Sequence, residues 1–277
     1  MQPRPSFVPQ GISNLAPIII SSPTTRSGTT LLQRLLCSSD NAIVYGEVCS
    51  SDLDLYLNFF INRAMMYQFN RAKLDSSLQS FKEGEVNDWI LDLMPNLDGY
   101  LSALGNACFA GIDYCRLAAL EMNRPVWGFK YPGWTPAVLN ALRQMMPDFK
   151  LLYIHRNLLG CVKSDKARGN LGSLEELRAF CVSWTRNLEF VLSLKDSEHV
   201  LMVNYADLVG NSEQCLQTIS AFTGASNIQQ SVLNVKVNTF KDSASNHMGY
   251  VAPAELSAEE LNLVESLSSS LRQVLYG

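Results

Sequence analysis

The feature that most constrains the fold of this chain is a short β-branched run. It is followed by a hydroxyl-rich loop and then by leucines at helical spacing. Residues 16–20 read Ala-Pro-Ile-Ile-Ile, which is typical of a strand buried in a parallel sheet. Residues 22–30 are mainly Ser, Thr and Gly, and leucines then recur at helical spacing at Leu31, Leu32, Leu35 and Leu36. A strand, a loop and a helix in this order form the first half of a βαβ unit, so the segment predicts an α/β fold.

The same alternation continues along the chain. Apolar runs predict strands at 126–130, 149–155 and 200–203. Helical spacing predicts helices at 135–146, 158–164 and 174–194, one that ends near residue 223, and a last one at 256–275. We therefore expect a single domain over residues 1–277, built as a three-layer sandwich with a central parallel sheet and a P-loop-like nucleotide-binding core.

Residues 50–124 differ from the rest because they show no strand pattern. Leu, Met, Phe and Tyr recur there in mixed periods, which indicates mainly helical structure without an internal repeat. We expect a helical insertion at about 50–124 that binds the substrate, together with a polar loop at 239–250.

The loop between the first strand and the first helix has the composition of an anion site. Backbone N–H groups at a helix N-terminus point toward one spot, and the helix dipole adds positive potential there. Ser27, Thr29 and Thr30 add hydroxyl donors, and Gly28 lets the backbone approach a phosphate closely. Arg26 adds a planar, permanently charged fork suited to phosphate or sulfate.

This loop departs from the P-loop of nucleoside triphosphatases. When the second glycine of G-x-x-x-x-G-K-[ST] is aligned on Gly28, Pro23 takes the first glycine position and Thr29 takes the lysine position. The lysine that reaches the β- and γ-phosphates is absent, so ATP or GTP hydrolysis is disfavoured.

The stretch Pro23-Thr24-Thr25-Arg26-Ser27-Gly28-Thr29-Thr30 resembles the 5′-phosphosulfate loop of sulfotransferases that use PAPS (3′-phosphoadenosine 5′-phosphosulfate). It is most similar to the group with Arg in this loop, which includes tyrosylprotein and bacterial enzymes, although two threonines precede the Arg. The resemblance implies that the family's 3′-phosphate ligands, an Arg at a strand end and a Ser eight residues later, are Arg156 and Ser164. Tyr205, in a segment similar to the family's Tyr-Glu-Asp-Leu, is implied to contact the adenine.

The resemblance also implies the catalytic residues. Glu47 follows a glycine after the first helix, where related enzymes carry a Gly-Glu pair with the general base, and Asp113 and His247 are the rival bases. Lys130 matches a family lysine that contacts the sulfonate or the leaving oxygen. Arg26 and Lys130 would stabilise the charge that develops during transfer, without a metal.

The charge and the cysteine content of the chain limit the kinds of partner and the cellular compartment that we expect. The net charge is −4, which argues against nucleic acid as a partner. Residues 40–124 hold 12 Asp and Glu against 6 Lys and Arg, so we hypothesise a cationic acceptor. Seven cysteines without a metal spacing, no secretory signal in residues 1–14 and no long apolar run lead us to expect a cytoplasmic protein away from the membrane. A homodimer is left open.

Taken together, these features predict a sulfotransferase. It would transfer a sulfonate group from PAPS to a hydroxyl, amine or guanidinium nitrogen of a small molecule of specialised metabolism, and would release adenosine 3′,5′-bisphosphate. Two alternatives remain at this point: a P-loop-type small-molecule kinase, and a non-catalytic module that binds adenosine bisphosphate.

Overall fold

The computed structural model describes residues 8–85, 93–235, 240–241, 248–249 and 252–276. Its strands are β1 (Ile18–Ser21), β2 (Ala42–Tyr45), β3 (Val126–Lys130), β4 (Lys150–His155), β5 (Val200–Asn204), β6 (Phe240–Lys241) and β7 (Met248–Gly249). Its helices are α1 (Gln10–Ser13), α2 (Thr29–Cys37), α3 (Glu47–Phe69), α4 (Arg71–Lys82), α5 (Leu97–Glu121), α6 (Pro136–Met145), α7 (Leu158–Lys166), α8 (Leu174–Leu192), α9 (Tyr205–Gly210), α10 (Ser212–Thr223), α11 (Ala258–Tyr276) and the 3₁₀ helix η1 (Gln230–Asn234).

Five parallel strands form the central sheet in the order β2-β3-β1-β4-β5. The predicted strands at the start of the chain and at 126–130, 149–155 and 200–203 are confirmed as β1, β3, β4 and β5. Strand β2 was not predicted. It is a short strand at one edge of the sheet, where buried and partly exposed side chains alternate.

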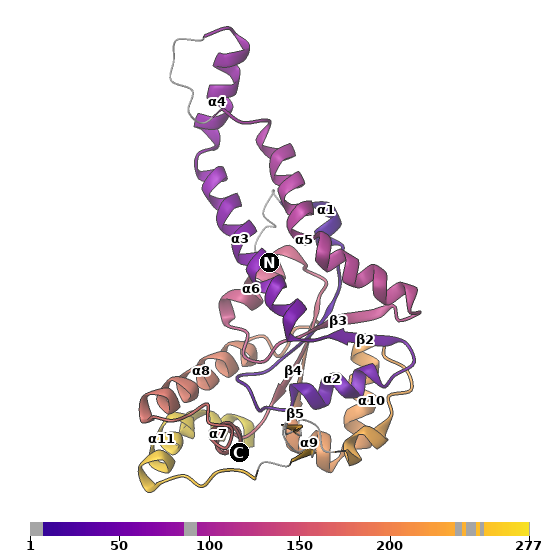
Figure 1. Ribbon diagram of the computed structural model, residues 1–277, viewed down its shortest axis with the longest axis vertical. Coiled ribbons are helices and arrows are strands. Elements are labelled where there is room, and N and C mark those ends of the chain that lie inside the picture. Colours follow the sequence, from indigo (N-terminus) through magenta and orange to yellow (C-terminus); the bar gives the residue numbers. More distant parts are fainter. Residues whose placement is uncertain (1–7, 86–92, 236–239, 242–247, 250–251, 277) are drawn as a thin grey trace.

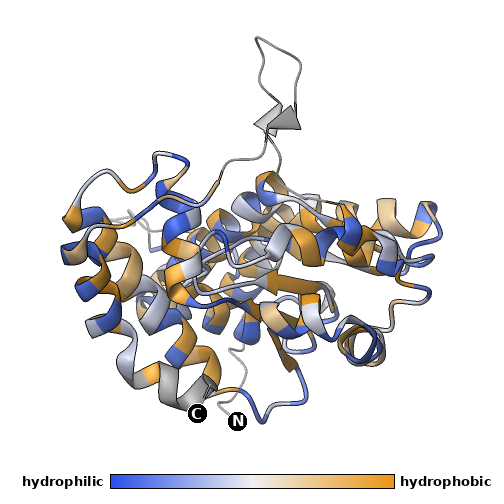
Figure 2. Cartoon of the chain, turned by 90° about the horizontal axis from the view of Figure 1, so that it is seen from below, coloured by the Kyte–Doolittle hydropathy of each residue, from blue (hydrophilic) through white to orange (hydrophobic). Residues whose placement is uncertain are grey.

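Helices cover both faces of the sheet, as expected for a three-layer sandwich (Figure 1). Alternate residues of β1 belong to opposite cores because strand side chains alternate between faces. Ile18 and Ile20 pack with α2 and α10, whereas Ile19 packs with the side that carries α6, α8 and α11. Figure 2 shows the strands as mainly hydrophobic and enclosed between these layers.

Local signals explain where the helices begin. Thr135 caps α6, whose first residue is Pro136, a residue with a backbone that is already fixed near helical φ. Ser173 and Glu176 form a capping box at α8. These two helices therefore begin where capping chemistry favours them, close to the predicted positions 135 and 174.

The insertion forms an arm that stands away from the sheet (Figure 1). Helix α3 runs out along it, α4 lies near its far end, and α5 returns beside α3 toward β3. The expected helical character of residues 50–124 is thus confirmed over the described part of that range. In the predicted loop at 239–250, the described residues are the two short antiparallel strands β6 and β7, and the rest lies outside the described residues.

Candidate active site

The loop after β1 lies between two strand ends that carry charged side chains. In the sheet, β1 is hydrogen-bonded to β3 on one side and to β4 on the other. Lys130 is the last residue of β3, and Arg156 follows the last residue of β4. Because the carboxyl ends of parallel strands meet at one edge, the fold brings Lys130, the loop and Arg156 to the same edge.

The loop is folded around the backbone carbonyl of Thr24. The hydroxyls of Ser22 and Ser27 donate to this carbonyl at 2.7 and 3.0 Å. Both serines are fully buried. The side chain of Ser27 therefore stabilises the fold of the loop.

Contacts from outside fix the same loop. The amide of Asn187 on α8 donates to the carbonyl of Pro23 at 2.8 Å, and the N–H of Gly133 donates to the carbonyl of Ser22 at 2.9 Å. Asn187 is almost fully buried. A loop held at consecutive residues by the core is preorganised for a ligand, because little ordering remains to be done when the ligand binds.

Two residues of the loop adopt left-handed backbone conformations. Gly28 has a φ of 108° and Arg26 a φ of 66°. A Cβ atom on Gly28 would lie only 2.6 Å from Cδ2 of Tyr205, so glycine is needed both for the backbone and for the packing of this ring. Positive φ is uncommon for arginine, and such strain gathers at functional sites. Thr29 and Thr30 then open α2.

The structure brings together the predicted donor ligands from separate segments. The Nε group of Arg26 donates to the hydroxyl of Ser164 at 3.0 Å. The guanidinium of Arg156 donates to the carbonyl of Arg26 at 3.4 Å and lies 4.9 Å from the ring centroid of Tyr205. Asn157 caps α7 and thereby sets the two helical turns that separate Arg156 from Ser164.

A third arginine, Arg168, joins this group and was missed in the sequence. Burial lowers the pKa of Arg26 from its ordinary value, and the charge of Arg168 is the next largest cause, with Arg156 acting in the same direction. Asp165, which is buried, opposes them. The available signal was spacing, since Arg168 follows Ser164 by four residues, about one helical turn.

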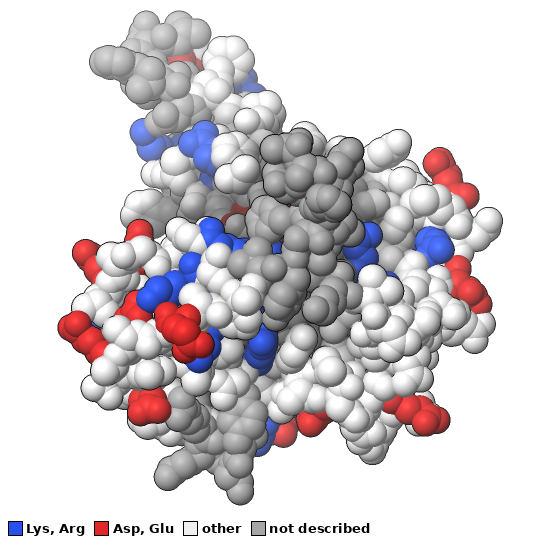
Figure 3. Space-filling model, turned by 60° about the horizontal axis from the view of Figure 1, so that its bottom comes forward, with Lys and Arg blue, Asp and Glu red and all other residues white. Residues whose placement is uncertain are grey.

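The resulting concentration of positive charge is suited to an anion. Figure 3 shows several Lys and Arg side chains on the face turned toward the viewer, with most Asp and Glu side chains nearer its margins. The guanidinium groups of Arg26 and Arg156, together with the charge of Arg168 that acts on Arg26, suit a group with more than one negative charge, such as a phosphate monoester. In the described ranges, no cluster of His, Cys, Asp and Glu is arranged to hold a metal ion.

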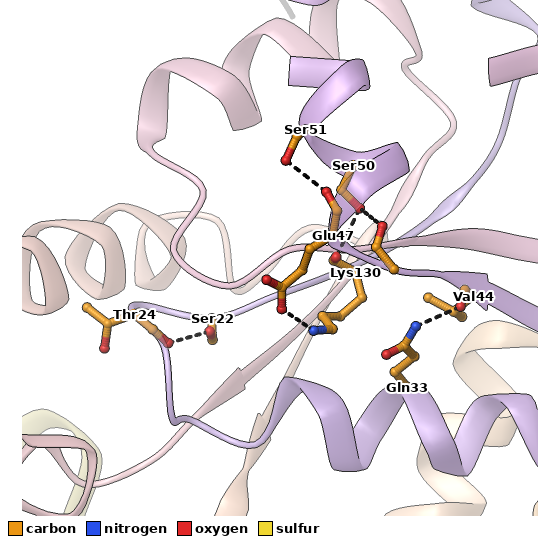
Figure 4. A network of polar contacts seen from close by, with 9 residues as sticks. Ser22, Thr24, Gln33, Val44, Glu47, Ser50, Ser51 and Lys130 are labelled. Atoms are coloured by element: carbon orange, nitrogen blue, oxygen red, sulfur yellow. Dashed lines mark hydrogen bonds and ion pairs between the residues drawn. The ribbon is translucent and has the colours of Figure 1, made fainter. Parts of the chain in front are cut away.

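Glu47 and Lys130 form an ion pair on the other side of the loop (Figure 4). Strand β2 lies parallel to β3 with Tyr45 opposite Phe129, so Glu47, the first residue of α3, starts beside the end of β3. The Nζ group of Lys130 donates to Oε1 of Glu47. The side chain of Lys130 is only 6% exposed, whereas that of Glu47 is 53% exposed. The carboxylate thus faces solvent at the sheet edge while the ammonium lies beneath it.

Of the two rival bases, the structure describes Asp113. Asp113, on α5, accepts a hydrogen bond from Arg116 at 2.7 Å and is engaged in that ion pair. His247 lies outside the described residues. Of the candidate bases that the structure describes, Glu47 is the one that contacts Lys130.

Comparisons with known proteins identify the family of the chain. A family model described as "Sulfotransferase family" matches residues 17–229. No curated protein sequence matches the chain.

Solved structures show where the fold recurs. The chain is similar to the sulfotransferase domain of the olefin synthase of Synechococcus PCC 7002, at 17% identity, with 92% of this chain and 96% of that chain covered and a TM-score of 0.50. It is also similar to mouse sulfotransferase SULT7A1, solved in complex with PAP, at 11% identity, 96% and 89% coverage and a TM-score of 0.53. At these identities the likeness concerns the fold.

Proposed function

Since the chain belongs to the sulfotransferase family and is thereby a PAPS-dependent sulfotransferase, we propose that it transfers the sulfonate group of PAPS to a hydroxyl or nitrogen of a small molecule, with Glu47 as general base. The arrangement that carries the proposal is the order of the strand ends. The phosphate-binding loop lies between Arg156 on one side and the Glu47–Lys130 pair on the other. One end of the site thus suits a phosphate and the other suits proton transfer.

The residues around the loop fit a donor with two separate anionic groups. The loop N–H groups with Thr29 and Thr30 would hold the 5′-phosphosulfate. Arg156, Ser164 and Arg168 would hold the 3′-phosphate. Arg26 lies between the two sets, because its side chain reaches Ser164 while its backbone belongs to the loop. We assign Tyr205, which packs on Gly28, to the adenine side of the donor.

In the proposed reaction the acceptor attacks sulfur, the bond between sulfur and the bridging phosphate oxygen breaks, and a bond from sulfur to the acceptor forms. Glu47 takes the proton of the acceptor group. Lys130 and Arg26 stabilise the negative charge on the departing phosphate oxygen. The ammonium of Lys130 has three N–H donors, so it can orient Glu47 and still donate to another oxygen. The donor leaves as adenosine 3′,5′-bisphosphate, and the scheme requires no metal.

The donor assignment is tested by calorimetric titration with adenosine 3′,5′-bisphosphate and, separately, with ATP and Mg²⁺. We expect the bisphosphate to bind, and Arg156→Ala to weaken it about 10- to 100-fold because charged hydrogen bonds are lost. Arg143→Ala removes an exposed arginine from α6 and is the matched control. Preference for ATP would favour the kinase alternative, and unchanged binding by Arg156→Ala would refute the site.

The catalytic assignment is tested by transfer of radiolabelled sulfonate from PAPS to a panel of metabolites. Glu47→Gln should leave bisphosphate binding intact and lower transfer by roughly 100-fold or more, since a general base contributes that much. If the unmodified protein binds the bisphosphate but transfers sulfonate to no member of the panel, the non-catalytic module becomes the better interpretation.

We propose further that the acceptor is cationic, an amine or guanidinium compound. The support is the acidic excess in residues 40–124, in which Asp52 and Asp54 lie on α3 within two turns of Glu47. A panel that pairs cationic metabolites with neutral phenols and sterols tests this. Sulfation of the neutral compounds alone would refute the cationic acceptor and leave the sulfotransferase assignment intact.

We place the protein in specialised metabolism in the cytoplasm as part of the same proposal. In the part of the chain that the structure describes, no helix combines the length and apolarity needed to cross a bilayer.

A further inference from the structure

Helix α3 carries two apolar seams, and only one of them is covered. The inner seam consists of Ser50, Leu53, Leu57, Phe60 and Ala64, which are all buried. It faces α5 and the body of the protein, where the rings of Phe60 and Phe109 meet edge to face. The inner seam therefore accounts for the way the arm is attached.

The outer seam consists of Leu55, Phe59, Asn62, Met66 and Phe69. Leu55, Phe59, Asn62 and Met66 each lie two residues after a buried residue of the inner seam, and Phe69 continues this series. Two residues correspond to about 200° around the helix, so the outer seam lies on the opposite side of α3 from the inner seam. The apolar members are 66%, 50%, 42% and 89% exposed in chain order, and Asn62 is exposed as well. A helix that is apolar on opposite faces is expected to be covered on both.

The spacing of the outer seam identifies the kind of partner. Its members are separated by four, three, four and three residues, which is the 3.5-residue repeat of a coiled-coil seam. A groove that binds a small ligand needs no such repeat, whereas a facing helix does. A single asparagine in the middle of an apolar seam is the residue that sets register when one helix pairs with another.

We propose that this seam pairs with the same seam of a second copy of the chain, antiparallel, about a two-fold axis at Asn62. Reversal about Asn62 places Phe59 opposite Met65, with Met66 next to it, and Leu55 opposite Phe69, so apolar residues meet apolar residues throughout. Asn62 then meets its own copy, as a residue on a two-fold axis must. The apolar residues of this interface take no part in the proposed chemistry.

Charge favours the antiparallel direction over the parallel one. Asp52 and Asp54 precede the outer seam, and Arg71 and Lys73 follow it. An antiparallel pair brings the acidic end of one helix to the basic end of the other, although Arg71 is also paired with Asp98 of its own chain. A parallel pair would place like charges side by side.

The area of the surface is sufficient for a dimer. The outer seam, with the flanking Tyr56 and Met65, exposes on the order of 700 Å² of side chain, close to the roughly 800 Å² that each partner buries in a standard interface. The stretch from Leu55 to Phe69 contains one charged residue, Arg63, which donates to the hydroxyl of Tyr67 at 2.6 Å. A helix that binds a membrane surface would be flanked by many more cations.

Sedimentation velocity over a range of protein concentrations tests the proposal. We expect the full chain to form dimers, and the double variant Phe59→Lys with Phe69→Lys to raise the dimer dissociation constant by at least about 100-fold. Phe81→Lys, at an exposed position on α4 outside the seam, is the control and should leave the dimer intact. Unchanged bisphosphate binding verifies that the double variant is folded.

A cross-linking experiment tests the register. With oxidised glutathione as the oxidant, Asn62→Cys should form a disulfide-linked dimer, because the residue meets its own copy. Leu55→Cys alone should not, whereas a mixture of Leu55→Cys and Phe69→Cys should. A chain that is monomeric at its highest soluble concentration, a dimer that survives the double variant, self-linking of Leu55→Cys, or binding to neutral phospholipid vesicles without dimers would each overturn the proposal.

Discussion

The Glu47–Lys130 ion pair should respond unequally to removal of its two partners. Lys130 is buried and Glu47 is half exposed. Glu47→Ala leaves an ammonium without a counter-charge beneath the surface. Breaking a fully buried ion pair lowers the free energy of unfolding by about 3–5 kcal/mol. Because water reaches this pair through Glu47, we expect Glu47→Ala to lower it by about 2 kcal/mol. Lys130→Met removes the buried charge, keeps an apolar side chain of similar length and leaves the carboxylate of Glu47 in water. We therefore expect Lys130→Met to lower the free energy of unfolding by less than about 1 kcal/mol.

The double variant completes the cycle. With Lys130→Met in place, Glu47→Ala no longer strands a charge, so the double variant should be nearly as stable as Lys130→Met alone, with a coupling free energy of about 1–2 kcal/mol. Urea unfolding followed by the fluorescence of the buried Trp127, Trp134 and Trp184 measures this. Glu121→Ala, at an exposed position at the end of α5, is the control for loss of a carboxylate.

Activity and stability should separate in these variants. Both single variants should lose sulfonate transfer, although only Glu47→Ala should lose much stability. Equal free-energy losses in the two single variants, or additive losses in the double variant, would show that Lys130 does not depend on Glu47 for its charge. The assignment of the pair as a coupled catalytic unit would then fail.

Three further outcomes are expected. Gly28→Ala should lower the free energy of unfolding by roughly 1–2 kcal/mol or more and weaken bisphosphate binding in calorimetry, because φ is 108° and the new Cβ meets Tyr205; unchanged binding would contradict this packing. Asn187→Leu should cost about 1–3 kcal/mol in urea unfolding, because it leaves the Pro23 carbonyl unpaired; wild-type stability would contradict it. Burial raises the pKa of the thiols of Cys115, Cys161 and Cys181 from 9.0 to about 11, so the folded state keeps protons that the unfolded state releases. The midpoint of thermal unfolding should therefore stay constant below pH 9 and fall as the pH rises toward 11. A midpoint that does not change with pH would count against the burial of these thiols.

The sheet core was largely predictable from the sequence because its signals are local. Ile18 to Ile20 form a short β-branched run, which is typical of a buried strand, and the loop follows directly. Arg156 and Ser164 were found through a family resemblance in which spacing carries the information. The structure joins them through Arg26, a contact between residues more than a hundred positions apart that no local pattern reports.

Other features were not predicted because their sequence patterns are short or overlap with one another. Strand β2 has four residues at a sheet edge, and its short alternating pattern is too brief to distinguish from a loop. The bond from the Ser27 hydroxyl to the carbonyl of Thr24 was not predicted, because it depends on how the loop folds back. In α3 the inner and outer seams are superposed, so the apolar residues showed mixed periods in place of a single one.

Helix α3 begins at Glu47 and continues for 23 residues, roughly 34 Å, to the far part of the arm. The proposed base and the exposed seam therefore belong to one uninterrupted rod. A displacement of the arm would therefore reach the carboxylate of Glu47 through a continuous helix, and the ion pair with Lys130 would oppose it.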